Sequence, residues 1–362
     1  MKSDKELYEL YLAGDIAAYD ELIMRYGDSL TFYLNGYLHN LQDAEDLMVE
    51  AFARIMVKKP RIKGDGGDIN MNEFEYEIKP YEEGDNDYIE EKIEEYNFSV
   101  VEPAEGEKEE TVILKITDEE DKVIAGCITK FYPWKIAYLN VLWVDETYRQ
   151  KGLGSKLIQE YERLAREKEC YISILYTADF HARPLYEKHG YKVIGTNKNS
   201  PRGHEFYAMV KRLDEPCREY VSSKEPINCE IKVGDKEDSE VIRKGIADYS
   251  DSIVPDQCRE SDVSCKITDA DGKMIAGCSC NVDSWGGCYI ELWVDEPYRN
   301  QGIGTRLIEY AQQKAREKEG YLAAVYVFDW RKGFFEKNGF TAWMTLENFP
   351  QGHTYYAMKK EL

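Results

Sequence analysis

Two glycine-rich turns of the same pattern stand 150 residues apart in this chain of 362 residues. The first is Arg149-Gln150-Lys151-Gly152-Leu153-Gly154 and the second is Arg299-Asn300-Gln301-Gly302-Ile303-Gly304. Glycines at this spacing let the backbone turn sharply and expose N–H groups at the start of a helix, whose N-terminus favours anions. Each turn therefore predicts a site for a pyrophosphate group. One such turn is a weak signal, but its recurrence in the same context is a strong one.

The turns belong to a long internal repeat. Residues 124–127 recur as residues 275–278, and other matching segments keep the same spacing of 150 or 151 residues. Solenoid units are only about 20–50 residues long, so a spacing of this length indicates a duplicated domain. We define residues 74–213 as repeat 1 and residues 228–362 as repeat 2.

Within each repeat, strand and helix patterns alternate. In repeat 1 the apolar residues of 153–165 recur at helical spacing, and a second helix is expected at 184–189 before Gly190. The strands are expected at residues 112–116, 123–125, 137–144, 171–176 and 205–210. The fold class predicted is α/β, used twice and preceded by a small all-α module.

Residues 142–157 resemble the fourth strand, pyrophosphate loop and third helix of the GNAT superfamily of N-acetyltransferases, and residues 292–307 repeat the resemblance. The two repeats make up about three quarters of the chain. The resemblance implies an α+β mixed-sheet fold, acetyl-CoA bound through its pyrophosphate, and direct transfer of the acetyl group to an amine. The cofactor-binding residues implied are Leu142, Trp143, Val144, Arg149, Gln150, Lys151, Gly152, Leu153, Gly154, Ser155, Leu292, Trp293, Val294, Arg299, Asn300, Gln301, Gly302, Ile303, Gly304 and Thr305.

Transfer to an amine needs a base, because a lysine-like amine with a pKa of about 10.4 is mostly charged at neutral pH. It also benefits from an acid that protonates the departing thiolate. The resemblance implies that Tyr186, in Leu185-Tyr186-Glu187-Lys188, is this acid, although a packing aromatic is the alternative interpretation. Repeat 2 has Phe335 at the matching position, without a hydroxyl group.

The expected base shows the opposite asymmetry. Glu291 resembles the glutamate of the fourth strand that many GNAT enzymes use, whereas repeat 1 has Asn140 in this stretch, which can hydrogen-bond but cannot act as a carboxylate base. Because strand residues alternate faces, a shift of one residue decides whether Glu291 faces the cleft. Each repeat lacks one acid–base group, and the stretch from Thr177 to Pro184 favours repeat 1 as the active one.

His204 and His353 stand at the same place in the two repeats, each in a Pro-x-Gly-His segment. A histidine titrates near pH 6.5 and could act as a base or orient a substrate. A turn held by a structural histidine is the equal alternative.

Residues 1–64 belong to neither repeat and carry two amphipathic helical patterns. Residues 20–26 and 43–52 resemble the first part of region 2 of extracytoplasmic-function sigma factors, a helical pair that docks on core RNA polymerase in that family. The resemblance implies a contact with polymerase through Asp43, Asp46 and Glu50. A recruited helical cap is the alternative, and residues 64–68 are expected to form a flexible linker.

Composition restricts the classes of function. The net charge of −22 argues against DNA binding as a function and favours a cationic amine as the substrate. No apolar run is long enough to span a bilayer and the N-terminal residues are charged, so we expect no membrane association and a cytoplasmic location. Cys278 and Cys280 lack partners at zinc spacing, so no metal site is predicted.

Two hypotheses of function follow. The first is an acetyl-CoA-dependent N-acetyltransferase acting on the primary amine of a small molecule or peptide. The second is a transcription-associated protein that holds core RNA polymerase through residues 1–64 and senses acetyl-CoA with its repeats.

Overall fold

The computed structural model describes residues 2, 4–38, 45, 47–49, 51–52, 76–103, 106–215 and 229–362. The chain divides into two units, residues 1–75 and residues 76–362, which are described separately. None of the helices in these described stretches is both long enough and apolar enough to cross a membrane.

The N-terminal unit contains α1 (Asp4–Leu12) and α2 (Ile16–Leu38), which pack through a small apolar core. Tyr11 of α1 and Tyr19 of α2 are buried there, with their ring centroids 4.4 Å apart. The helical character expected near the N-terminus is therefore confirmed. The residues of the predicted polymerase contact, Asp43, Asp46 and Glu50, lie outside the described part of the chain, so that contact stays a prediction.

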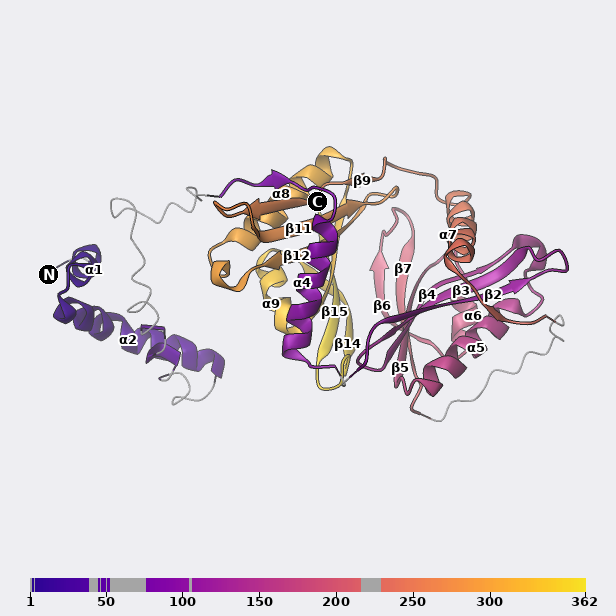
Figure 1. Cartoon of the computed structure of the whole chain (residues 1–362), viewed down its shortest axis with the longest axis horizontal. Coiled ribbons are helices and arrows are strands. Elements are labelled where there is room, and N and C mark those ends of the chain that lie inside the picture. Colours follow the sequence, from indigo (N-terminus) through magenta and orange to yellow (C-terminus); the bar gives the residue numbers. More distant parts are fainter. Residues whose placement is uncertain are drawn as a thin grey trace. The chain divides into compact units, whose positions relative to one another are not determined.

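The second unit is a mixed α/β structure, which confirms the predicted fold class (Figure 1). The elements of repeat 1 are β1 (Lys79–Pro80), α4 (Asp85–Val100), β2 (Glu110–Thr117), β3 (Val123–Tyr132), β4 (Ile136–Val144), η1 (Glu146–Tyr148), α5 (Leu153–Glu167), β5 (Ile172–Ala178), α6 (Arg183–Lys188), β6 (Lys192–Lys198) and β7 (Glu205–Arg212). The elements of repeat 2 are β8 (Lys232–Val233), α7 (Lys236–Asp251), β9 (Ser261–Asp262), β10 (Cys265–Thr268), β11 (Met274–Val282), β12 (Gly287–Val294), η2 (Glu296–Tyr298), α8 (Ile303–Glu317), β13 (Leu322–Phe328), α9 (Asp329–Lys337), β14 (Thr341–Glu347) and β15 (Thr354–Glu361).

The strands of both repeats join in one continuous sheet. Its order is β1-β10-β11-β12-β13-β15-β14-β6-β7-β5-β4-β3-β2-β8, with β9 paired to β11. The two halves meet where β14 pairs antiparallel to β6, at Met344 and Gly195. A Cβ atom on Gly195 would lie 2.5 Å from the Cβ of Met344, so the junction requires a glycine.

The first strand and first helix of each repeat pack on the other repeat. In Figure 1, α4 lies against β11 and β12 of repeat 2, and α7 lies against the strands of repeat 1. The short strand that precedes each of these helices also joins the other repeat, since β1 pairs with β10 and β8 pairs with β2. Each sheet half is therefore completed by a segment that belongs to the other repeat.

Equivalent residues hold the two exchanged helices. Ile89 of α4 and Ile242 of α7 are both fully buried, and each packs directly on a glycine of the opposite sheet half. A Cβ atom on the glycine under Ile89, Gly277, would lie 2.5 Å from that side chain, so the helix can approach only because a glycine is present. Ion pairs add to this packing, with Lys266 bound to Asp85 and Lys115 bound to Asp238, each at 2.7 Å.

The parallel strand pair at the centre of each half separates along its length. Strands β12 and β13 pair only from Gly287 to Tyr289, and β4 and β5 pair only from Ile136 to Leu139. Beyond these residues, toward the C-terminal ends of the strands, β12 no longer pairs with β13 and β4 no longer pairs with β5. The backbone polar groups on that side of β12 and β4 therefore have no partners in the parallel strand. The glycine-rich turns follow the same ends of β12 and β4.

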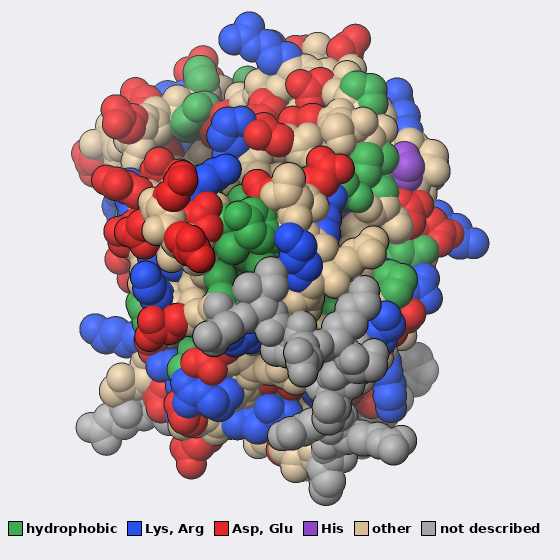
Figure 2. Space-filling model, turned by 90° about the vertical axis from the view of Figure 1, so that its right-hand side faces the viewer, with side chains coloured by type: hydrophobic (Ala, Val, Ile, Leu, Met, Phe, Trp, Pro, Cys, Tyr) green, Lys and Arg blue, Asp and Glu red, His purple; other side chains and the backbone are tan. Residues whose placement is uncertain are grey.

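The face drawn in Figure 2 belongs to the end of the molecule at which α5, α7 and β2 lie. Acidic and basic side chains are interspersed over it, and hydrophobic side chains form only small groups. Such a mixed surface is typical of a protein with a large net charge and no extended apolar patch on that face.

Candidate active site

The second glycine-rich turn lines a cavity of about 530 Å³ between β12, α8 and α9. The turn is left-handed at Asn300 (φ +60°) and Gly302 (φ +78°), and α8 begins at the next residue. A Cβ atom on Gly304 would lie 3.0 Å from Phe334, so the glycine lets α8 pack closely on α9. The predicted residues that line this cavity are Leu292, Trp293, Val294, Arg299, Asn300, Gly302, Ile303, Gly304 and Thr305.

Positive charge surrounds this cavity. The guanidinium of Arg299 donates from Nε to the carbonyl of Val294 at 2.9 Å and stacks over the ring of Tyr96 at 4.6 Å. Lys337, at the end of α9, lines the cavity as well. Together with the N–H groups of the first turn of α8, which have no acceptors within their own helix, these cations suit a phosphorylated ligand. The cavity therefore fits the cofactor that the sequence implies.

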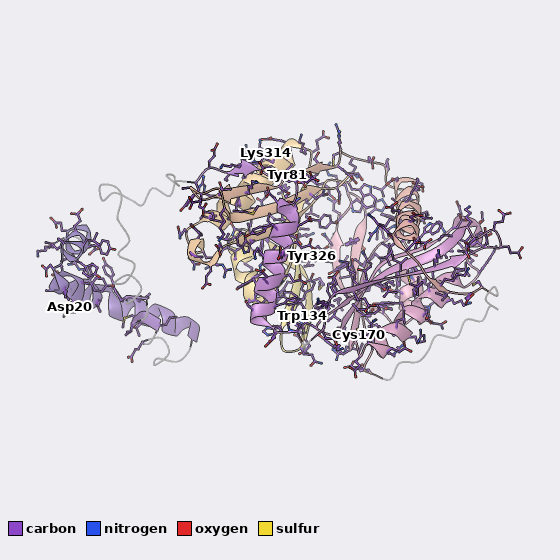
Figure 3. All side chains as sticks on the ribbon, viewed as in Figure 1. Asp20, Tyr81, Trp134, Cys170, Lys314 and Tyr326 are labelled. Carbon is purple, nitrogen blue, oxygen red and sulfur yellow. The ribbon has the colours of Figure 1, made fainter. Side chains whose placement is uncertain are left out.

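A second cavity of about 970 Å³ adjoins the first, and Ile93 and Arg331 line both. Both repeats contribute to its walls. Trp134 from the β3–β4 turn and Tyr326 from β13, labelled in Figure 3, are two of its aromatic residues. The full lining is Asp87, Glu90, Glu91, Ile93, Glu94, Asn97, Phe98, Glu109, Tyr132, Pro133, Trp134, Ile136, Tyr138, Ile174, Tyr176, Phe206, Tyr289, Ile290, Glu291, Tyr326, Val327, Phe328, Arg331, Phe335, Phe349 and Tyr355. We call this cavity the chamber.

One wall of the chamber is acidic. Asp87, Glu90, Glu91 and Glu94 stand at positions i, i+3, i+4 and i+7 of α4 and thus share one face of that helix. Within the described part of the chain, none of these four carboxylates forms an ion pair with a lysine or arginine. Burial, together with the charges of Glu109, Glu90 and Glu91, raises the pKa of Glu94. The wall therefore carries negative charge that a cationic ligand would neutralise.

Glu291 faces into the chamber from β12. It pairs with Ser279 of β11 in an unbroken register, and its neighbours Ile290 and Leu292, which alternate with it along the strand, are buried. The Glu291 side chain is exposed to the open chamber. Desolvation by the surrounding walls still raises the pKa of its carboxyl group, and the negative charge of Glu90 raises it further, while Arg331 opposes the shift. A carboxylate of raised pKa is a stronger base, so this position suits the removal of a proton from an amine.

Aromatic rings form another part of the chamber lining. Tyr326 stacks with Tyr289 at 6.4 Å and with Tyr355 at 6.5 Å between ring centroids, and Tyr176 meets Tyr326 edge to face at 5.5 Å. Burial raises the pKa of Tyr326 well above its ordinary value, so its hydroxyl group stays neutral. The faces of such rings attract cations, as do the carboxylates of α4.

Repeat 1 differs at the equivalent strand. The register of β3 and β4 shifts between Ile128 and Thr129, which leaves Asn140 as the extra residue of a β-bulge. After the bulge, Val141 takes the place that Glu291 has in repeat 2, because Leu142 and Leu292 both pair with the matching cysteines of the neighbouring strands. The change of repeat spacing from 151 to 150 residues is the sequence signal of this bulge.

Tyr186 lies in the hydrophobic core of repeat 1 and is 7% exposed. Burial is also the main cause that raises the pKa of its hydroxyl group. Its predicted role as the acid stays a prediction. The glycine-rich turn of the same repeat has the expected geometry, with Gly152 at φ +85° and Arg149 stacked over Tyr249 of α7 at 4.3 Å.

His204 and His353 hold their turns in the same way. The Nδ1 atom of His204 lies 2.9 Å from a carboxylate oxygen of Asp179, and that of His353 lies 3.2 Å from Asp329. Each aspartate also accepts a backbone N–H group from the residue after the histidine. Neither histidine is among the residues that line the two cavities described above, so the geometry favours the structural interpretation.

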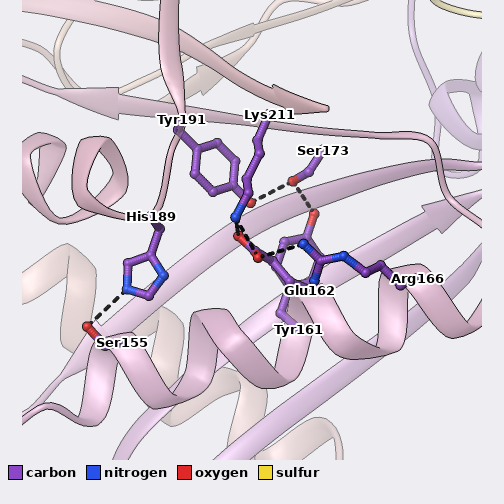
Figure 4. A network of polar contacts seen from close by, with 8 residues as sticks. All are labelled: Ser155, Tyr161, Glu162, Arg166, Ser173, His189, Tyr191 and Lys211. Atoms are coloured by element: carbon purple, nitrogen blue, oxygen red, sulfur yellow. Dashed lines mark hydrogen bonds and ion pairs between the residues drawn. The ribbon is translucent and has the colours of Figure 1, made fainter. Parts of the chain in front are cut away.

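Two groups of polar contacts lie along α5 in repeat 1 (Figure 4). Lys211 donates to both oxygens of Glu162 at 2.7 Å, and both side chains are 6% exposed. His189 contacts Ser155, one of the predicted cofactor residues, through Nε2 at 3.0 Å. Burial lowers the pKa of His189 to about 4, so the ring is neutral at physiological pH.

Comparison with known proteins agrees with this architecture. A model described as the acetyltransferase (GNAT) family matches residues 71–191, and one described as an acetyltransferase (GNAT) domain matches residues 262–342. A blasticidin-S acetyltransferase from Streptomyces morookaense is 35% identical over 91 residues, which cover 25% of this chain and 67% of that protein. The chain belongs to the GNAT acetyltransferase family.

Solved structures of acetyltransferases also resemble parts of the chain. An acetyltransferase from Bacillus cereus ATCC 14579 is 33% identical, with 38% of this chain and 96% of that chain covered and a TM-score of 0.36. An aminoglycoside 6'-N-acetyltransferase solved with coenzyme A is 14% identical, with 33% and 79% covered and a TM-score of 0.26.

The sequence did not reveal the residues that α4 and α9 bring to the GNAT site of repeat 2. Tyr96 stacks on Arg299, and Ile93 and Arg331 stand where the two cavities meet. A usable signal was present, because Asp85, Ile89 and Tyr96 recur 153 residues later as Asp238, Ile242 and Tyr249. That recurrence marks the helices as equivalent, but it gives no indication that they are exchanged.

Proposed function

We propose that the chain is an N-acetyltransferase that uses acetyl-CoA, and that its reacting site lies in repeat 2. The observation that carries the proposal is the meeting of two cavities at Ile93 and Arg331, one formed by the glycine-rich turn and one containing Glu291. When bound, acetyl-CoA supplies an acetyl group on a thiol leaving group. Although the sequence favoured repeat 1, these cavities support repeat 2.

The residues of the smaller cavity hold the cofactor in this proposal. The amides of residues 300–305 and the positive N-terminus of α8 bind the pyrophosphate, and Lys337 adds a cation for a further phosphate group. Arg299 is itself fixed by Val294 and Tyr96, so it keeps the turn in its binding conformation.

The chamber receives the amine. Four carboxylates of α4 attract a cation, and the tyrosine faces of β12, β13 and β15 provide contacts with it over their ring faces. Arg331 is the only cationic side chain among the lining residues that the structure describes, so the acceptor that fits best carries more than one positive charge. Glu291 removes the proton from the ammonium group and passes it to solvent.

The test is release of the CoA thiol from acetyl-CoA by the full-length chain. The acceptors are spermidine, an aminoglycoside and a lysine-containing peptide, with glutamate as an amine that carries net negative charge. We expect release with at least one of the polycations and none above background with glutamate. Absence of release with every amine would overturn the proposal, and release with glutamate alone would overturn the assignment of the chamber.

A further inference from the structure

Arg331 stands at the boundary between the two cavities of repeat 2. It follows the end of β13 on the first turn of α9 and lines both the chamber and the cofactor cavity. A group transferred from a ligand in one cavity to a ligand in the other would pass close to these shared lining residues. The side chain is therefore positioned next to the reacting atoms of the proposed reaction.

The guanidinium of Arg331 reaches β12 where that strand no longer pairs with β13. Its Nη2 atom donates to the carbonyl of Leu292 at 2.6 Å, three residues beyond the last residue of β12 that pairs with β13. This bond fixes the guanidinium beside β12 and uses one of its five N–H donors. It also lies over the ring of Phe335 at 5.9 Å.

No carboxylate in the described part of the chain is close enough to Arg331 to form an ion pair with it. Burial lowers its pKa to about 10, while the charge of Glu291 opposes that shift. The group therefore remains a cation at neutral pH. Holding a partly buried cation without a fixed counter-ion costs free energy, and an anionic ligand would offset that cost.

The equivalent position of repeat 1 has no such cation. Asp329-Trp330-Arg331 corresponds to Asp179-Phe180-His181, because each aspartate binds the histidine of its own turn. His181 is bonded to Ser250 at 2.9 Å, and burial lowers its pKa to about 4. Repeat 1 thus combines the hydroxyl group of Tyr186 with a neutral histidine. Repeat 2 combines Phe335, which has no hydroxyl group, with the charged Arg331.

We propose that the guanidinium of Arg331 binds the sulfur of the departing CoA thiolate and stabilises its negative charge, where Phe335 has no proton to donate. This inference rests on the proposed function. In the transfer, a bond forms between the amine nitrogen and the acetyl carbon, the carbon–sulfur bond breaks, and its electron pair stays on sulfur. The two protons lost by the ammonium group leave through Glu291 and solvent, and the thiolate later takes one proton from solvent.

The test measures the ionisation of the CoA thiol bound to the full-length chain, followed by the ultraviolet absorbance of the thiolate across a pH titration. A free thiol has a pKa of about 8.5, and we expect the pKa of the bound thiol to lie at least about one unit lower. In Arg331→Gln it should return to about the value of free CoA, and Arg331→Lys should be intermediate. A second titration step near the free value would report CoA bound at repeat 1.

Lys332→Gln is the matched control. Lys332 is the next residue of α9, pairs with Glu336 at 3.1 Å and lines neither cavity, so its loss should not change the thiol pKa. Arg331→Gln should also lower turnover by about 10²–10³-fold, as removal of a charge-stabilising donor does in other enzymes.

The outcomes separate the two proposals. An unchanged thiol pKa in Arg331→Gln would overturn the role of Arg331, even if turnover fell, because a purely structural loss does not shift the thiol. A shifted thiol pKa without release of thiol by any amine would overturn the proposed function but leave the thiolate contact in place. Absence of CoA binding to the unaltered chain would overturn both.

Discussion

Repeats 1 and 2 share their element order, their exchanged helices and their glycine-rich turns, yet their polar side chains are placed differently. On the helix covering repeat 2, Glu90 and Glu91 face the chamber, whereas the equivalent residues of α7 are Arg243 and Lys244. The cores of the two repeats differ as well, and there repeat 1 has the charged groups, because its core contains the buried ion pair of Glu162 and Lys211. Repeat 1 has a buried ion pair in its core, and repeat 2 is covered by a helix with exposed carboxylates around a cavity, which indicates that structural and chemical roles have separated between the copies.

The largest effect is expected from the base. Glu291→Gln should lower kcat/KM by about 10²–10⁴-fold, as loss of a general acid–base group typically does, while Tyr186→Phe should stay within about threefold. Steady-state release of CoA thiol measures both. A loss of tenfold or more in Tyr186→Phe, with Glu291→Gln unaffected, would reverse the comparison and return the chemistry to repeat 1.

The exchange of helices can be tested through packing. Ile89→Ala should cost about 2–5 kcal/mol of unfolding free energy, because a fully buried side chain is removed from a close-packed site. Hydrogen exchange followed by mass spectrometry should show faster exchange in β11 and β12, not in β3 and β4. Ile242→Ala is the matched variant, and in it hydrogen exchange should become faster in β3 and β4, not in β11 and β12. Faster hydrogen exchange within the repeat that contains the altered residue would contradict the packing of each helix on the other repeat.

The buried ion pair should distinguish the cores. Lys211→Met leaves the carboxylate of Glu162 buried with only the partly exposed Arg166 as a partner, which should cost about 3–5 kcal/mol. The equivalent Lys360 donates to the neutral Gln312 at 3.1 Å, so Lys360→Met should cost about 1–2 kcal/mol. Chemical denaturation measures the loss of unfolding free energy in both variants. Equal losses would contradict the prediction that the buried ion pair contributes more to stability than the contact with Gln312.

The smallest effect concerns pH. Activity requires Glu291 to be deprotonated, so kcat/KM should rise with pH through a pKa above the ordinary glutamate value of about 4.3. Glu90→Gln removes a negative charge that raises this pKa, so the acidic limb should move to lower pH and the KM of a polycation should increase a few-fold. Arg243→Gln is the control on α7. If the acidic limb of the pH profile stayed at the same pH in Glu90→Gln, the effect of Glu90 on the pKa of Glu291 would be contradicted.

The sequence alone predicts the repeat, the mixed α/β class and the two turns, because glycine spacing and apolar periodicity are local properties. It also identifies Glu291 as the residue to examine. It does not predict that Glu291 faces a cavity, since that depends on whether β12 contains a bulge. The sequence does not predict that Tyr96 lies beside Arg299, because the two residues are far apart in the chain and no pattern in the sequence links them.

The exchanged helices impose an order on the synthesis of the chain. When α4 leaves the ribosome, β11 and β12 have not yet been made, and translation at about 5–20 residues per second separates Val100 from Val294 by about 10–40 s. During that interval the apolar side of α4, with Ile89 at its centre, lacks its native cover. A chain that is truncated or cleaved between the repeats would leave each sheet half without the helix that covers it. The native fold therefore requires synthesis of both repeats in one chain.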